Sequence, residues 1–141
     1  MSAGVRELRV WQESVALAGD VILAVRQGMR RETKSVSEAV MATALVIGTH
    51  ISDGYARPTP LEQRDAYLAA KRALLRLETE LAVAKHANLI PPGSFTELTL
   101  RSGQVTKLLT GFLAYLDRQV AENSERAPPS AVSPGSDRVP S

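Results

Sequence analysis

The chain has 141 residues, a formal net charge of +2, 44% hydrophobic residues, 4% aromatic residues and no cysteine. This length fits a single domain that can bury a core of its own. Abundant Ala, Leu and Val with few aromatic side chains favour helix packing over an aromatic-rich sheet, so the predicted class is all-α. The lack of cysteine excludes disulfides, thiolate nucleophiles and Cys-ligated zinc.

The N-terminal residues and the hydropathy of the chain predict a soluble, cytoplasmic protein. Charged side chains interrupt residues 1–9, so this stretch lacks the apolar centre of a signal peptide. No segment reaches the roughly 18 uncharged apolar residues of a membrane span. The sequence pI is near 9.2, which permits a nucleic-acid partner without requiring one.

The first predicted helix has apolar residues at alternating spacings of three and four. We expect its core-facing seam to be the stripe Leu8, Trp11, Val15, Ala18, Ile22, Val25 and Met29. A second stripe consists of Val10, Leu17, Val21 and Ala24. Two stripes exceed what one pair of neighbouring helices covers, which indicates deep burial or coverage by another subunit. Because Trp11 lies on the predicted seam, we expect it to be a packing anchor and not a base-stacking platform.

The second helix is predicted to begin at a capping box formed by Ser35 and Glu38, in which each side chain bonds the backbone amide of the other. Residues 39–48 are apolar almost all round, which indicates burial on several sides. Asp53 and Gly54 supply a helix stop, and the prolines of residues 57–60 make a rigid connection.

The third helix has the best-defined start in the chain. Thr59 is the predicted N-cap, Pro60 occupies the first turn and Glu62 is acidic at the third position. One apolar stripe consists of Tyr67, Ala70, Leu74, Leu77, Leu81 and Ala84. A second stripe repeats every seven residues and consists of Leu61, Leu68, Leu75, Ala82 and Leu89. This helix is therefore also expected to be covered on two sides.

The fourth helix follows a break at residues 91–93, with a second capping box predicted at Ser94 and Glu97, and is expected to end near Glu122. Short connections predict an antiparallel up-down-up-down bundle over residues 1–122. Residues 123–141 are rich in Pro and Ser and nearly free of large apolar groups, so we expect a disordered tail.

Three segments stand out by their order and spacing along the chain. They are Arg6-Glu-Leu-Arg-Val-Trp-Gln12, Ile51-Ser-Asp-Gly-Tyr-Ala-Arg57 and Leu77-Glu-Thr-Glu-Leu81. These segments resemble the signatures of a bacterial family of four-helix-bundle proteins. The family includes the large-subunit ribosomal RNA intervening-sequence proteins and the accessory variability determinant proteins of diversity-generating retroelements. The resemblance spans roughly residues 5 to 121.

The resemblance implies a four-helix protomer that assembles into a ring-like homopentamer. In the retroelement members, a basic surface binds a reverse transcriptase and nucleic acid. This sequence departs from the pattern at Met41 and Ala42, where many members carry a basic pair, and at His50, where they carry Asn. These departures keep open an alternative, in which the protein is a structural or protein-interaction scaffold that does not bind nucleic acid.

Two sets of basic residues are the candidate nucleic-acid contacts. The first surrounds the end of the first helix and contains Arg26, Arg30, Arg31 and Lys34. Cations there also complement the negative C-terminus of that helix, which is a structural explanation for them. The second set lies along the third helix and contains Arg64, Lys71, Arg72, Arg76 and Lys85. Repeated around a ring, either set would form a band that holds phosphates.

The sequence predicts no catalytic residue, cofactor site or metal site. His50 and Asp53 could share a helix face, but His86 is the only other imidazole, so the set falls short of a metal site. No Glu is followed three positions later by His, as a di-iron bundle would need. The chain has no nucleophile elbow and no phosphate-cradling glycine-rich loop. We therefore expect a protein that acts by binding.

Overall fold

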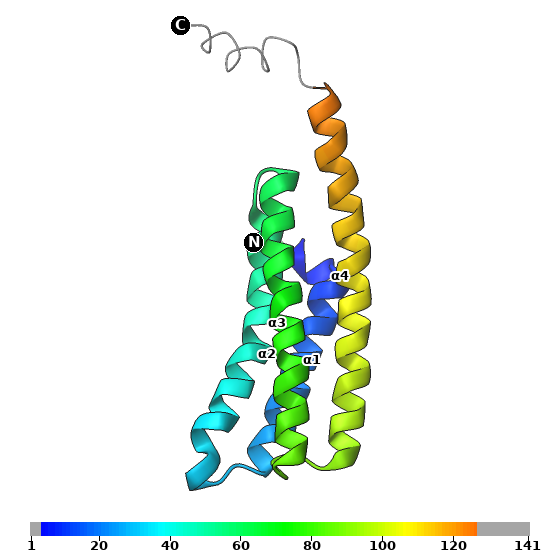
Figure 1. Cartoon of the computed structure of the whole chain (residues 1–141). Helices are drawn as coiled ribbons and strands as arrows, with labels where there is room; N and C mark the ends of the chain where they lie inside the picture. Colours follow the sequence, from blue (N-terminus) through cyan, green and yellow to red (C-terminus); the bar gives the residue numbers. More distant parts are fainter. Residues whose placement is uncertain (1–3, 127–141) are drawn as a thin grey trace, which may run out of the picture.

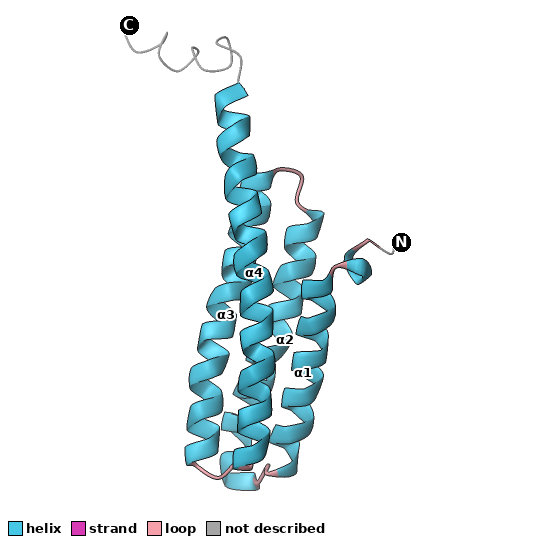
Figure 2. Cartoon of the chain, turned by 90° about the vertical axis from the view of Figure 1, so that its right-hand side faces the viewer, coloured by secondary structure: helices cyan, strands magenta, loops and turns pink. Residues whose placement is uncertain are grey.

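The computed structural model describes residues 4–126, which form four α-helices joined by short connections (Figure 1). The helices are α1 (Arg9–Gln27), α2 (Lys34–Ala56), α3 (Pro60–His86) and α4 (Pro92–Arg126). Two short 3₁₀ helices, Val5–Glu7 and Arg31–Thr33, precede α1 and α2. Each helix packs against the next, and α4 closes against α1 (Figure 2). The predicted all-α antiparallel four-helix bundle is confirmed.

The core consists of the apolar side chains that point toward the bundle axis. On α3 the first predicted stripe is confirmed, because its members from Tyr67 to Ala84 are all buried, whereas Leu61 and Leu75 of the second stripe are exposed. Fully burying one Leu or Ile side chain stabilises a fold by about 1.5–3 kcal/mol. Buried apolar side chains come from every helix, so the four helices share one hydrophobic core. The largest among them are Tyr67, Leu17, Ile47, Ile51, Leu74, Leu77, Leu81, Leu109 and Leu116.

The predicted seam of α1 is confirmed only in part. Its members Ala18 and Val25 are buried, but Val15 is 47% exposed. The second stripe, which includes Leu17 and Val21, is buried in the core. Trp11 is only half-buried, and its indole Nε1 donates a hydrogen bond to Ser52 Oγ at 3.1 Å. The two stripes lie on adjacent faces of one helix, and the packing of α2 and α4 decides which face turns inward. Trp11 therefore lies at the edge of the core and not at its centre.

Two of the predicted helix starts are also wrong. Ser35 lies inside α2, which begins at Lys34 after a 3₁₀ turn in which the Thr33 amide donates to the Arg30 carbonyl at 3.2 Å. Ser94 lies inside α4, which begins at Pro92. In both places the backbone turn or the proline starts the helix before the serine is reached.

The predicted start of α3 is confirmed, because the Thr59 side chain accepts a hydrogen bond from the Glu62 amide at 3.2 Å.

Two predicted helix ends differ from the structure. Gly54 does not stop α2, which continues to Ala56, and a Cβ at Gly54 would lie 3.0 Å from the ring of Tyr67. The glycine is therefore needed for packing against the tyrosine ring. Helix α4 continues past Glu122 to Arg126, and its C-terminal end projects beyond the other helices (Figures 1 and 2). Most of the predicted tail, residues 127–141, lies outside the described residues.

One segment of the described chain, Arg31–Ala56, is long and apolar enough by composition to cross a membrane, with a mean hydropathy of 1.2. In the bundle this segment buries Val40, Ala44, Ile47 and Ile51 against the other helices. The core helix of a bundle has the same composition as a marginal span. Packing in the core accounts for these four residues, but only 33% of the apolar window is buried, and Val36 and Leu45 are exposed.

Candidate nucleic-acid interface

The α1–α2 and α3–α4 connections lie together at one end of the bundle (Figure 1). Gly28 packs so closely on the Leu89 carbonyl that a Cβ at this position would overlap the carbonyl oxygen. Asn88 turns the chain with a positive φ of 63°, a conformation that asparagine tolerates better than most residues. The Leu89 amide then donates to the Ala84 carbonyl at 2.8 Å, which closes the end of α3. These backbone contacts fix the two connections against each other.

This end carries the first predicted basic set. Arg26, Arg30, Arg31 and Lys34 are all exposed. Lys34 lies 3.9 Å from Glu38, and this pair is solvent-exposed on both sides. The guanidinium groups of the three arginines take part in none of the ion pairs or side-chain hydrogen bonds found among residues 4–126. We call this surface, with Lys85, the basic end.

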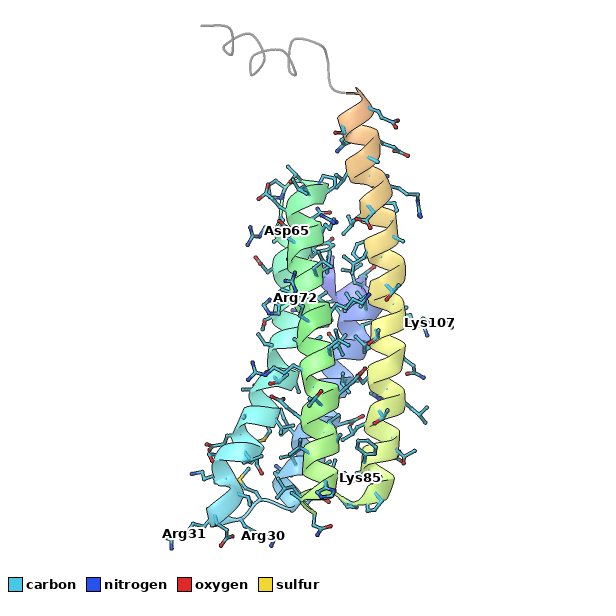
Figure 3. All side chains as sticks on the ribbon, in the orientation of Figure 1. Arg30, Arg31, Asp65, Arg72, Lys85 and Lys107 are labelled. Carbon is cyan, nitrogen blue, oxygen red and sulfur yellow. The ribbon has the colours of Figure 1, made fainter. Side chains whose placement is uncertain are left out.

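The second predicted basic set does not form one surface. Lys85 belongs to the basic end: its Nζ lies 4.8 Å above the centre of the Phe95 ring on α4, and Figure 3 shows it at the same end as Arg30 and Arg31. Arg64, three heptads earlier on the same face of α3, bonds Asp117 on α4 through Nε at 2.6 Å. Lys71 shares that face and is half-buried.

Arg72 and Arg76 face a different way, because they line a groove between α2 and α3 together with His50. In Figure 3, Arg72 lies well along α3 from Arg30 and Arg31. The predicted band along α3 is therefore divided between the α4 side, the basic end and the α2 side.

At the opposite end of the bundle, the arginine of the α2–α3 connection is neutralised within the fold. Arg57 bonds Asp53 through Nε at 3.1 Å and Nη2 at 3.0 Å, and its Nη1 lies 3.8 Å from Glu62. The hydrogen bond from Arg57 holds the pKa of the Asp53 carboxyl below its ordinary value, and the same bond raises the pKa of Arg57. This cation already has its acceptors, which argues against a role in ligand binding.

An apolar groove of about 520 Å³ runs between α1 and α2. Its walls include Val15, which is 47% exposed, and Leu45, which is 55% exposed. Small residues such as Ala18 and Gly48 line it between these walls, and Trp11 also contributes to it. Trp11, Val15 and Ala18 belong to the α1 stripe that the sequence predicted to face the core. We call this surface the α1–α2 groove.

The sequence also matches a known protein family. Residues 6–111 match the family model of the 23S rRNA-intervening sequence proteins. The chain belongs to this family. The matched segment contains all the basic residues named above and both connections of the basic end, and it confirms the resemblance inferred from the three sequence segments. No match to a curated protein was found. Within residues 4–126, this family member has no group of three His, Asp or Glu side chains that could hold a metal ion.

Proposed function

We propose that this family member is a non-catalytic, self-associating accessory protein that binds nucleic acid through its basic end. The proposal rests on one observation, the group of exposed arginines Arg26, Arg30 and Arg31, which form no ion pair with any carboxylate of residues 4–126. An exposed guanidinium without a protein acceptor can take two oxygens of a phosphate in a bidentate contact.

The helix dipole explains only part of this basic group. Arg26 lies in the last turn of α1, where a cation complements the negative C-terminus. Arg30 and Arg31 lie just before α2, and the N-terminus of a helix is positive and disfavours cations. A structural role therefore does not account for these two side chains, whereas contact with phosphates does.

Self-association would increase the effect of a modest charge. The α1–α2 groove exposes apolar side chains from two helices, a feature that marks interaction surfaces in soluble proteins. A second copy of the chain that covers this groove would bring several basic ends into one assembly, and the family resemblance favours a ring-like homopentamer. The summed field of such an assembly would attract nucleic acid more strongly than one protomer.

Binding is tested by fluorescence anisotropy with labelled single-stranded DNA, RNA and duplex DNA at two salt concentrations. We expect binding that tolerates any sequence and weakens steeply with salt, because released counterions drive phosphate contacts. The variant Arg30→Glu with Arg31→Glu should bind at least about tenfold more weakly. The control, Lys107→Glu with Arg118→Glu, makes the same change of charge on two exposed positions of α4. Figure 3 shows Lys107 away from the basic end.

Self-association is tested by light scattering at micromolar concentration. Leu45→Glu should convert the assembly to monomers, because it places a charge in the α1–α2 groove. Leu100→Glu is the control, since Leu100 is 66% exposed on α4 and lies outside that groove. A wild-type monomer would contradict the assembly.

A second candidate function is a scaffold that binds protein and not nucleic acid. The near-neutral net charge of +2 and the non-basic pair Met41-Ala42 favour it. Failure of the wild-type assembly to retain any nucleic acid at low salt would select this alternative. The partnership with a reverse transcriptase rests on the resemblance alone. A reverse-transcriptase gene with template and variable repeats beside this gene would support it, and a position within a ribosomal RNA insertion would argue against it.

A further inference from the structure

A second cationic surface lies on the side of the bundle, in the groove of about 450 Å³ between α2 and α3. His50 from α2 and Arg72 and Arg76 from α3 line it. The other lining residues are Thr43 and Val46 of α2 and four alanines, two from each helix, namely Ala39, Ala42, Ala69 and Ala73. We call it the α2–α3 groove. It is separate from the basic end, as the position of Arg72 shows in Figure 3.

The cations of this groove retain donors for a ligand. Arg72 is exposed and takes part in none of the ion pairs found in the described part of the chain. Arg76 is 71% exposed and is held by Glu80 through Nε at 2.9 Å, a contact that does not involve its Nη groups. The guanidinium is thus oriented along α3 by one carboxylate oxygen while its outer edge faces solvent.

Acidic residues lie next to the groove but are partly neutralised. His50 also lines a smaller pocket of about 280 Å³ with Asp53, Glu62 and Asp65. Arg57 lies in that pocket and pairs with both Asp53 and Glu62. Asp53 and Glu62 therefore already have a cation, whereas Asp65 takes part in none of the ion pairs among residues 4–126. No carboxylate of the described residues lines the α2–α3 groove itself.

We infer that the α2–α3 groove binds a phosphate-bearing nucleotide unit. Arg72, Arg76 and the His50 imidazole would contact the phosphate, and the alanine methyl groups would lie against the sugar or base. Planar guanidinium groups match phosphate oxygens in pairs, and the small alanine side chains leave room for a flat ring beside Thr43 and Val46. An acidic peptide fits less well, because the floor offers no deep apolar pocket for an anchoring side chain.

The nucleotide unit could belong to a bound strand or be a free mononucleotide. The first source rests on the proposed function, because the strand would reach the groove from the basic end of the same protomer or of a neighbour. The second source does not depend on the proposed function. Both share the phosphate chemistry, so the experiment uses both kinds of probe.

The two histidines of the chain report the two surfaces separately. His50 lines the α2–α3 groove, and His86 ends α3 beside Lys85 at the basic end. Imidazole resonances are recorded by heteronuclear NMR at fixed pH and assigned with the His86→Gln variant. The full-length protein is titrated with thymidine monophosphate, with oligothymidylate and with an oligoglutamate peptide. We expect both nucleotide probes to shift His50 and only the oligonucleotide to shift His86.

Two variants test whether the groove itself is responsible. Ala42→Glu places a carboxylate in the groove and should weaken nucleotide binding, as reported by the His50 shift, at least about tenfold. The control Ala114→Glu, at an exposed alanine of α4, should leave nucleotide binding unchanged. Glu80→Gln releases Arg76 from its carboxylate partner and should tighten nucleotide binding several-fold. A purely structural role of Arg76 would not produce that gain.

The outcomes separate the two proposals. A His50 shift with the monophosphate as strong as with the oligonucleotide supports a nucleotide site, and a much tighter response to the oligonucleotide supports a strand site. A response of His86 alone overturns the groove proposal and leaves the basic end standing. Suppose that the wild type binds no strand but His50 still responds to thymidine monophosphate. If this response persists in the variant Arg30→Glu with Arg31→Glu, it supports the groove and contradicts the proposed function. A response to oligoglutamate but to neither nucleotide overturns the inference.

Discussion

The two ends of the bundle differ in what their arginines contact. At the α2–α3 connection, Arg57 bonds Asp53 and approaches Glu62, and nearby Arg64 bonds Asp117. At the basic end, Arg26, Arg30 and Arg31 take part in none of the ion pairs among residues 4–126. A paired arginine must break its protein contacts to reach a ligand, whereas the arginines of the basic end need not. The pairing of charges, and not their number, distinguishes a structural surface from a candidate binding surface.

The ends also differ in what holds them together. The α2–α3 end is fixed by side chains, since Tyr67 packs on Gly54 and lies 4.8 Å from the ring centre of Phe112, and Thr59 caps α3. The basic end is fixed by backbone, through the packing of Gly28 on Leu89. Substitution of its charged side chains should therefore change binding and leave the fold intact.

The largest expected effect is at the α2–α3 end. Tyr67→Ala should lower the free energy of unfolding by about 3–5 kcal/mol, because it removes a large aromatic ring from the core and leaves a cavity. Urea denaturation followed by circular dichroism measures this loss. A loss below about 1 kcal/mol would show that Tyr67 does not anchor this end.

The same tyrosine predicts a pH dependence of stability. Burial raises the pKa of Tyr67 to about 12 from the ordinary value near 10. The Tyr67 hydroxyl therefore loses its proton at lower pH in the unfolded chain than in the folded chain. Its contribution to the free energy of unfolding is complete below pH 10 and is lost between pH 10 and about 12. The loss is at most about 2–3 kcal/mol. Thermal melts across this range should show it, and Tyr67→Phe should remove that part of the pH dependence.

At the basic end, Gly28→Ala should destabilise the fold by about 1–3 kcal/mol, because the added methyl group overlaps the Leu89 carbonyl and forces the backbone to shift. The control is Gly111→Ala on α4, where nothing lies within 4 Å of the added Cβ. That change should stabilise the helix by about 0.5–1 kcal/mol. Equal effects of the two substitutions in chemical denaturation would contradict the proposed backbone contact.

The cap of α3 gives a smaller effect. Thr59→Ala removes the acceptor for the Glu62 amide and should cost about 1 kcal/mol of stability. Thr59→Asn should retain most of that stability, because an asparagine side chain also accepts this bond. Comparison of the two variants by denaturant unfolding separates the cap from the general effect of replacing the threonine.

The smallest effect on stability is expected for the charges of the basic end. Arg30→Gln with Arg31→Gln should change the free energy of unfolding by no more than about 0.5 kcal/mol per substitution, because neither side chain is in an ion pair within the described part of the chain. The same variant should bind nucleic acid more weakly than the wild type in the anisotropy assay. A large loss of stability would instead assign these arginines to the fold.

The sequence alone determined those features that depend on neighbouring residues in the chain. The start of α3 follows from Thr59, Pro60 and Glu62, whose contacts span three residues, and the structure confirms it. The buried stripe of α3 follows from helical periodicity, and the family follows from three short segments. Local backbone geometry and periodicity are properties of a segment, so a segment suffices to predict them.

The tertiary structure decided features that depend on how each helix is rotated and placed. It turned Leu17 and Val21 inward and left Val15 in a groove, although both stripes of α1 have the same periodicity. It assigned Gly54 to packing under Tyr67 and separated Arg72 from Lys85, although both lie on α3. Periodicity fixes which residues share a face, but the direction of that face depends on distant helices, because only packing in three dimensions determines which surfaces are buried.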